Sequence, residues 1–467
     1  MNGMNRLSSN EFWPDQRTVW RWHFYAGIFC MPFVVVLSIS GAIYLFKTEI
    51  ESWNERAFDR LVVEGQPASA KDQTQAALTA VTNSSLEGYE IQSSSTRAAR
   101  VILKQAGEAI RVYVHPESCE VLQSSQESQR FMRTVFRLHG ELLMGDRGSM
   151  IVELAASWTI IMILTGLFLW WPRHSQGLGG VLFPRLNSGK RIVWRDMHAV
   201  TGIWISFFAM FLLVSGLPWA KFWGEYFKTV RRITGTAVAQ QEWSNSGERI
   251  DNRQESSGSG EHAGHTNRSA RPVRDTPDNV ETPPIDLDAI DRIISSVSLL
   301  NLASPVVISP PKENSQTWTV KSMTPNRPWR ETLTVDGDTG AIKSRNGFRD
   351  KHWIDQVIAV GTAAHEGRLF GAINQFIGLL TAAGLVMLST SGFVLWWKRR
   401  NPGVLGAPKA IESPCRSLGL LVIVVALGIA LPLFGASLVA VLLLEKLLLR
   451  RIAPVRTWLG LNESNRI

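Results

Sequence analysis

The chain has 467 residues, of which 45% are hydrophobic and 19% are charged, whereas soluble domains are about 25% charged. This low charged fraction favours a membrane protein, and the long apolar runs exclude a wholly disordered chain. Three cysteines are too few for a disulfide-stapled secreted domain. The net charge of +9 does not indicate nucleic-acid binding, because much of the positive charge flanks apolar runs, where it sets membrane topology.

Four apolar runs are long enough to cross a membrane, which takes roughly 20 helical residues. They lie at residues 24–46, 150–171, 198–219 and 372–397. A fifth apolar region, residues 418–449, has Pro432 and Gly435 near its middle. Because proline interrupts a helix, we expect two short helices that form a hairpin.

Lysine and arginine mark the segments expected on the cytoplasmic side. They are frequent in the connections 172–197 and 398–417 and in the C-terminal tail, 450–467. We therefore place these segments and the N-terminus (within residues 1–46) in the cytoplasm. The segments 47–149 and 220–371 then lie outside.

Each outside segment has the pattern of a small α+β domain. Strand-like alternation occurs at 100–104 and 109–114 in the first, and at 317–320 and 331–335 in the second. The second also has a helical pattern at 285–300. Residues 240–284 are polar and lack an apolar pattern, so we read them as a flexible insertion.

Two constant spacings indicate an internal repeat. His198, Gly202 and Ser215-Gly216 each follow a matching residue by 175 positions, and His365, Gly371, Gly392 and Leu395-Trp396-Trp397 follow theirs by 226. The matching residues are His23, Gly27, Ser40-Gly41, His139, Gly145, Gly166 and Leu169-Trp170-Trp171. We therefore expect a four-helix core built by tandem duplication, with an approximate axis along the membrane normal.

This repeat selects four of the nine histidines. An approximate two-fold axis would place His23 opposite His198 near the inner face, and His139 opposite His365 near the outer face. Two facing imidazoles can ligate the iron of a planar cofactor from both sides. The pattern thus predicts two b-type haems, which are non-covalent because the chain has no C-x-x-C-H motif. Gly27 and Gly202 lie one turn after their histidines, where a missing Cβ would admit a macrocycle.

The remaining histidines and the cysteines have simpler interpretations. His262 and His265 lie in the expected insertion, where a solvated linker is a better reading than a metal site. The other three histidines have no histidine at the repeat-equivalent position, and we expect structural or surface roles for them: His115, His174 and His352. The three cysteines fall in different compartments of this topology and cannot pair: Cys30, Cys119 and Cys415.

Several motifs resemble the PepSY-associated transmembrane family of bacterial inner-membrane proteins. They are LHGEL at 138–142, TGLFLWWPR at 165–173, RDMHAVTG at 195–202, WKRRNPG at 397–403 and LPLFGAS at 431–437. The outer turns VHPES at 114–118 and VDGDTG at 335–340 are similar to the strand-turn signatures of PepSY domains, although the first lacks the usual Asp and Gly. The resemblance implies two periplasmic PepSY-like domains and a dihaem reductase of ferric siderophores.

The expected function is therefore transmembrane electron transfer, from a cytoplasmic donor or membrane quinol to a ferric siderophore or chelate in the periplasm. No G-x-G-x-x-G motif occurs, so we expect the donor to be a separate molecule. Two other interpretations remain open. One is a non-redox periplasmic scaffold that binds or regulates a partner, and the other is a transporter for iron or a siderophore, although transporters usually have broken helices or midplane charges.

Overall fold

The structure is a computed structural model of the chain, and the residues described are 14–172, 177–236, 285–312, 317–408 and 418–461. The insertion expected at 240–284, with His262 and His265, lies outside the described residues. The same is true of His174 and Cys415.

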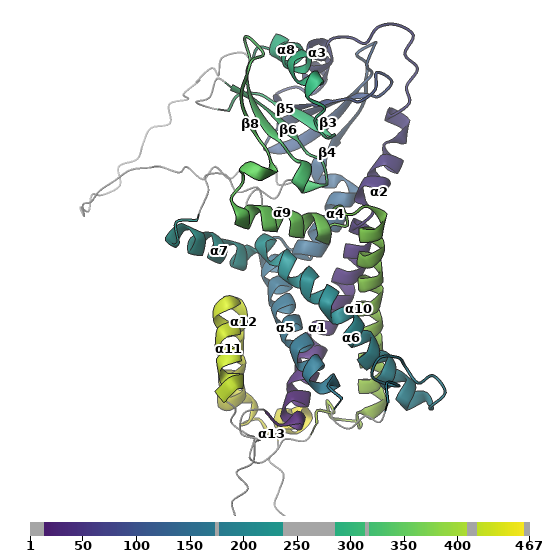
Figure 1. Cartoon of the computed structure of the whole chain (residues 1–467), viewed down its shortest axis with the longest axis vertical. Helices are drawn as coiled ribbons and strands as arrows, with labels where there is room; N and C mark the ends of the chain where they lie inside the picture. The colour runs from purple at the N-terminus through teal and green to yellow at the C-terminus, as the bar shows by residue number, and fades with distance from the viewer. Residues whose placement is uncertain (1–13, 173–176, 237–284, 313–316, 409–417, 462–467) are drawn as a thin grey trace, which may run out of the picture.

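Four long apolar helices form the centre of the molecule (Figure 1). They are α1 (Gln16–Tyr44), α5 (Asp146–Trp170), α6 (Lys190–Gly216) and α10 (Ala372–Arg399). With the stretch Pro432–Leu449, five helices among the described residues are long and apolar enough to cross a membrane. Three of the four begin before the expected apolar run, at Gln16, Asp146 and Lys190, because polar residues continue the helix past the hydrocarbon core.

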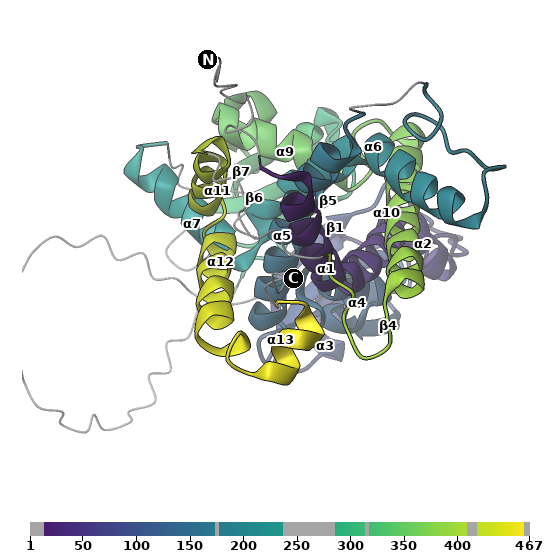
Figure 2. The ribbon, with the colours of Figure 1, turned by 90° about the horizontal axis from the view of Figure 1, so that it is seen from below.

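The four helices form one bundle, seen from below in Figure 2. Helix α1 packs on α5 and α10, and α6 packs on the same two helices. The two helices that carry His23 and His198, α1 and α6, are therefore diagonal to each other. This places the bundle axis between them.

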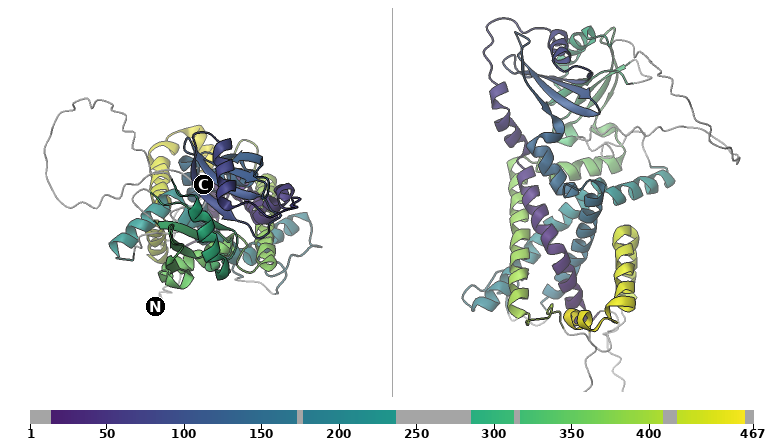
Figure 3. Two further views of the ribbon diagram at one scale, coloured as in Figure 1. Left: turned by 90° about the horizontal axis from the view of Figure 1, so that it is seen from above. Right: turned by 180° about the vertical axis from the view of Figure 1, so that it is seen from behind.

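A helical hairpin flanks the bundle (Figure 3). It consists of α11 (Leu418–Ala430) and α12 (Pro432–Leu444), and is followed by the π-helical turn Glu445–Leu449 and by α13 (Ala453–Leu459). The chain reverses at Leu431. Gly435 lies so close to Gly428 that a Cβ added to Gly435 would be 2.9 Å from the carbonyl oxygen of Gly428. Phe434 packs on Trp158 of α5, with ring centroids 5.0 Å apart.

A single antiparallel sheet of eight strands lies beyond one end of the bundle, in the order β4-β3-β2-β1-β5-β6-β7-β8. The first four strands come from the segment between α1 and α5, and the last four from the segment between α6 and α10. They are β1 (Ser85–Ile91), β2 (Ala99–Gln105), β3 (Glu108–Val114), β4 (Val121–Gln126), β5 (Val306–Ser309), β6 (Thr317–Ser322), β7 (Thr332–Asp336) and β8 (Ile342–Asn346).

The two expected α+β domains are thus joined into one soluble module. Strand β1 pairs with β5, where Tyr89 is opposite Ile308. Helices α3 (Ala70–Ala80) and α8 (Asp288–Val297) cover one face of the sheet, and their apolar residues share one core with both halves of it. Asp291 of α8 accepts hydrogen bonds from the backbone N–H groups of Ala70 and Lys71, at 2.8 and 3.0 Å, so one half caps a helix of the other.

Short helices connect the sheet to the bundle. Four of them form a layer between the two parts: α2 (Lys47–Asn54), α4 (Phe131–Glu141), α7 (Lys221–Ile233) and α9 (Trp353–His365). Short 3-10 turns lie at Arg56–Phe58, Glu127–Gln129, Leu217–Trp219, Ser298–Leu300, Arg327–Trp329 and Phe348–Asp350. The last turns of α4 and α9 carry His139 and His365, so this layer holds two of the four repeat-matched histidines.

Candidate functional site

The structure brings the four repeat-matched histidines together as two pairs. His23 of α1 faces His198 of α6 across the bundle, with ring centroids 6.3 Å apart and an interplanar angle of 81°. His139 of α4 faces His365 of α9 at the same separation, 6.3 Å, with an angle of 84°. The first pair, the inner pair, lies toward the end of the bundle that is remote from the sheet, and the second, the outer pair, lies beneath the soluble module.

Each histidine of the inner pair is anchored through Nδ1 to the neighbouring transmembrane helix. Nδ1 of His23 lies 3.0 Å from the carbonyl oxygen of Met162 and 3.1 Å from Oγ1 of Thr165. A carbonyl oxygen only accepts hydrogen bonds, so Nδ1 must carry the proton. His198 is held in the same way by the carbonyl of Leu388 (3.2 Å) and Oγ of Ser391 (3.1 Å).

The outer histidines are anchored through Nδ1 by serine hydroxyls of the long helices. Nδ1 of His139 lies 3.1 Å from Oγ of Ser40, and Nδ1 of His365 lies 2.9 Å from Oγ of Ser215. Each serine hydroxyl donates to a carbonyl of its own helix, which leaves its oxygen to accept the Nδ1 proton. Burial, together with the nearby His365, lowers the pKa of His139 to about 4, and burial also lowers the pKa of His365. Burial therefore favours the neutral form of both rings.

In all four histidines the Nε2 atom is consequently the unprotonated nitrogen, and it has no hydrogen-bond partner among the described residues. A neutral imidazole whose Nδ1–H is anchored by a second group is the usual form of a metal-ligating histidine. The described residues contain no group of three or more His, Cys, Asp or Glu side chains that could hold a metal ion by themselves. Each pair could hold a metal whose other ligands come from a cofactor.

Four glycines make room for the imidazoles. An added Cβ at Gly41 would lie 3.0 Å from Cε1 of His139, and one at Gly166 would lie 3.1 Å from Cε1 of His23. The corresponding distances in the other half are 3.5 Å for Gly216 to His365 and 3.4 Å for Gly392 to His198. These glycines allow the rings to lie against helix backbone.

Gly27 and Gly202 do not contact the histidines in this way. A Cβ at these positions would meet Met162 at 3.8 Å and Leu388 at 3.6 Å, which are ordinary van der Waals distances. The expectation that Gly27 and Gly202 leave room for a macrocycle is a different one, and it stays a prediction.

The anchoring role of these residues was not predicted from the sequence, although Ser40 and Ser215 are among the repeat-matched residues. Ser215 follows Ser40 by 175 positions, and Leu388 and Ser391 follow Met162 and Thr165 by 226. These are the two spacings that relate the histidines. A search of the repeat for hydroxyl residues as well as for identical ones would also have matched Thr165 with Ser391.

Two other histidines have local structural roles. His115 accepts hydrogen bonds at Nδ1 from the backbone N–H groups of Glu117 and Ser118, at 3.3 and 3.2 Å. His352 caps α9 by accepting from the N–H of Ile354 at 3.3 Å. Cys30 and Cys119 are both free thiols.

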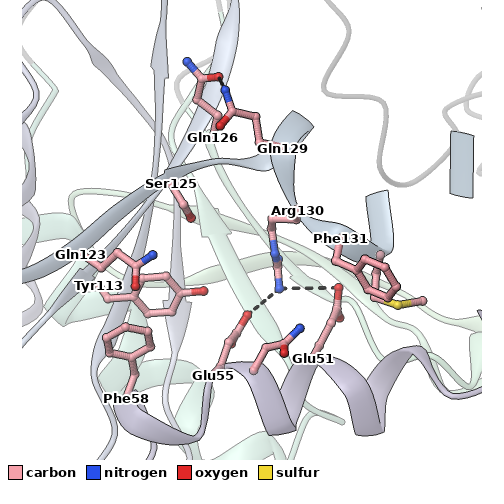
Figure 4. Close-up of a pocket in the computed structure, with 12 residues that line it drawn as sticks. Glu51, Glu55, Phe58, Tyr113, Gln123, Ser125, Gln126, Gln129, Arg130 and Phe131 are labelled. Carbon is pink, nitrogen blue, oxygen red and sulfur yellow. Dashed lines mark hydrogen bonds and ion pairs between the residues drawn. The ribbon is translucent and has the colours of Figure 1, made fainter. Parts of the chain in front are cut away.

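A polar cavity of about 300 Å³ lies between α2, α4 and the strands β3 and β4 (Figure 4). Glu51, Glu55 and Arg130 form one wall, and Tyr113 and Gln123 form another. The cavity is separate from the histidine pairs, but it shares α4 with His139. Its wall belongs to a larger network of ion pairs on the face of the sheet that is turned toward the bundle.

This network has alternating charges. Arg100 contacts Glu90 and Glu55, both at 2.9 Å, and Arg111 contacts Glu90 at 3.0 Å and also Glu127. Arg130 contacts Glu55, Glu127 (3.3 Å) and Glu51 (3.5 Å). Burial alone would raise the pKa of Glu127, but the Arg111 and Arg130 guanidiniums outweigh it and hold that pKa below its ordinary value. The network fixes α2 and α4 to the sheet.

Comparison with known proteins adds one finding. No curated protein matches the chain. The model of the PepSY-associated TM region matches residues 20–399, a segment that begins just before His23 and includes all four paired histidines. The match covers most of the 467 residues, and the chain therefore belongs to the family of the PepSY-associated TM region.

Proposed function

We propose that this protein is a dihaem electron-transfer protein of the bacterial inner membrane that reduces a ferric siderophore or another ferric chelate at its periplasmic face. The inner pair would hold one b-type haem and the outer pair a second. The observation that carries the proposal is the equal geometry of the two pairs, in which all four Nε2 atoms are free to bind iron.

The separation of the rings supports this assignment. A metal–imidazole bond is about 2 Å long, and the bonding nitrogen is about 1 Å from the ring centroid. Two imidazoles on opposite sides of one iron would therefore have centroids about 6 Å apart, and the observed separation is 6.3 Å in both pairs. Two imidazoles that merely packed together would have no reason to keep this distance twice.

The residues of this chain suit electron transfer better than substrate activation. With a histidine on each face, neither iron would have an open position for oxygen or substrate, so electrons would pass without a bond to the iron. The anchored Nδ1–H groups would hold each ring in place during the change of oxidation state. The haems would supply the one-electron chemistry. Each Fe(III) chelate would be reduced to Fe(II) by one electron, which comes from the donor.

The positions of the pairs favour two haem sites, here called stations, through which electrons would pass in turn. Gly41 of α1 contacts His139 of the outer pair. It follows His23 of the inner pair by 18 residues on the same helix, and 18 residues span about 27 Å along a helix. One station therefore lies near each end of the bundle. The described parts of the basic connections, residues 177–197 and 398–408, are at the inner end, which favours a cytoplasmic or quinol donor there and a periplasmic acceptor at the soluble module.

This function can be tested with four single variants in proteoliposomes. We expect His139→Ala and His365→Ala to lose the same haem and to abolish reduction of an external, membrane-impermeant ferric chelate, while the inner haem is still reduced by the donor. We expect His23→Ala and His198→Ala to lose the other haem and to leave the outer haem oxidised under the physiological donor, although dithionite still reduces it.

His352→Ala is the matched control, since His352 lies at the start of α9 but caps the helix instead of facing another histidine. It should retain both haems and chelate reduction. If His23→Ala and His365→Ala deplete the same haem, the pairing is wrong. If chelate reduction continues without the outer haem, that haem is not the exit point.

A further inference from the structure

Two cations stacked on aromatic rings lie on the sheet side of the outer pair. Tyr44 and Trp219 each follow, by three positions, the glycine that contacts an outer histidine, Gly41 or Gly216. Nζ of Lys47 lies 5.6 Å from the ring centroid of Tyr44, and the guanidinium of Arg327 lies 5.5 Å from that of Trp219. Tyr44 and Trp219 are themselves 175 positions apart, so each half of the protein contributes one such arrangement.

The two cations converge on one residue of the outer site. Glu366 directly follows His365, and its Oε1 accepts a hydrogen bond from Nη2 of Arg327 at 3.0 Å. Glu366 is also an electrostatic neighbour of Lys47. Lys47 and Arg327, which come from opposite halves of the chain, therefore lie beside the outer pair.

Arg327 is buried and only partly satisfied by the protein. The residue is 8% exposed, and its Nε–H has no hydrogen-bond partner among the described residues. A buried guanidinium with an unused donor is unfavourable unless a ligand completes its hydrogen bonds. The planar guanidinium is also the side-chain group that best matches a carboxylate.

The surrounding charge is positive. Tyr44 has electrostatic neighbours of both signs, Glu51, Glu366, Arg133 and Arg327, and Lys47 stacks on its ring. Together with Arg130 and Glu127, which are also electrostatic neighbours of Lys47, four cations lie around this position against three carboxylates. Burial lowers the pKa of Lys47, and an added anion would favour its charged form.

We propose that Lys47 and Arg327 bind the two propionate carboxylates of the outer haem. The inference rests on the proposed function, because it requires a haem between His139 and His365. The two cations, one from each half of the repeat, match the two carboxylates of the cofactor in number and charge. They set the orientation of the outer haem, with its propionates toward the soluble module, and they raise its reduction potential, because positive charge stabilises the more negative reduced form.

The test measures the outer haem in the purified protein, without acceptor, by potentiometric titration and resonance Raman spectroscopy. The outer haem is identified as the one absent from His139→Ala. In Arg327→Gln the ratio of reduced to oxidised outer haem at a fixed ambient potential should fall about tenfold, which is 59 mV for one electron, and the propionate bending band should shift. Lys47→Gln should change the same haem in the same direction, and Arg327→Lys should retain most of the wild-type potential.

Two controls separate propionate binding from a structural role. Arg345→Gln removes an exposed arginine of the same half, which pairs with Glu331 at 2.8 Å, and it should change neither haem. The double variant Arg327→Gln/Glu366→Gln removes the whole ion pair. If Arg327 only neutralises Glu366, this variant restores the wild-type band and potential, and the proposal is wrong; if Arg327 binds a propionate, the band stays shifted.

The failures of the two proposals are distinguishable. A protein without haem would refute the proposed function and this inference together. A protein with two haems whose potentials and propionate bands are unchanged in Arg327→Gln and Lys47→Gln would refute only the inference. If these variants raise only the KM for a carboxylate-bearing chelate, the cations bind the acceptor instead of the haem, which also overturns the proposal.

Discussion

The histidine side chains are positioned by contacts that a single methyl group would disturb. At Gly41 an added Cβ would lie 3.0 Å from Cε1 of His139, and this atom belongs to a ring that Ser40 also holds. The sequence identified the four histidines, because identical residues recur at constant spacing. It matched Ser40 with Ser215 without showing that they hold the outer histidines, and it did not identify the partners of the inner ones, because Ser391 replaces Thr165 and a backbone carbonyl leaves no trace in a sequence.

We expect Gly41→Ala to weaken or displace the outer haem while the inner haem stays unchanged. The added methyl group must push the His139 ring by a few tenths of an ångström, which alters the bond to iron. Gly27→Ala on the same helix is the control for the outer haem, which it should leave unchanged, since Gly27 lies one turn from His23 of the inner pair and its Cβ would meet Met162 at an ordinary 3.8 Å. Low-temperature absorbance spectra of the two variants should differ from each other, and identical spectra would mean that Gly41 does not limit the position of His139.

At the level of the elements, the sequence predicted four of the eight strands, β2, β3, β6 and β7, and missed the two that join the halves, β1 and β5, and the two at the edges, β4 and β8. The patterns at 100–104 and 109–114 correspond to β2 and β3, which are central and largely buried. The edge strands β4 and β8 are polar, with exposed residues on both faces, so they carry no period-2 signal. Helices α4 and α9 were also missed, because they are short and lie directly before the long helices α5 and α10.

The ion-pair network that holds α2 and α4 to the sheet predicts a pH dependence of stability. The pKa of Glu127 is lowered in the folded protein. The contribution of ionised Glu127 to the free energy of unfolding is therefore complete above its unfolded pKa of about 4.3. This contribution is lost as the pH falls through the lower pKa of the folded protein. We expect Glu127→Gln to cost about 1–3 kcal/mol at pH 7, the range for a buried polar group left unpaired.

The difference in thermal unfolding temperature between wild type and Glu127→Gln should shrink as the pH is lowered from 7 to about 3. Glu331→Gln is the matched control, because it breaks the more exposed pair with Arg345 and should lower the unfolding temperature much less. A difference that stays constant with pH would show that Glu127 does not contribute through its charge.

The whole molecule has one property that local sequence patterns do not contain. The two α+β units are joined through the pairing of β1 with β5, whose residues are more than 200 positions apart in the chain. Such pairing leaves no periodic signal, so two separate domains were the natural expectation. The joined sheet brings α4 and α9 from opposite halves to the same end of the bundle, where His139 meets His365.

This arrangement explains why one chain would contain both halves. A single half contributes only one histidine to each pair, so neither pair exists without the duplication. The mainly helical class, the membrane spans and the terminal hairpin were predictable from apolar length and from Pro432. The distances within the pairs required the structure.

The measurement that tests the central claim most directly is the haem content of the detergent-purified, full-length protein from haem-replete cells. Pyridine haemochrome analysis should give about two non-covalent haems per chain. The EPR spectrum of the oxidised protein should contain highly anisotropic low-spin signals, because the imidazole planes in the two pairs are at 81° and 84°. A folded but colourless protein, or one with a high-spin haem that has a vacant axial position, would contradict the account.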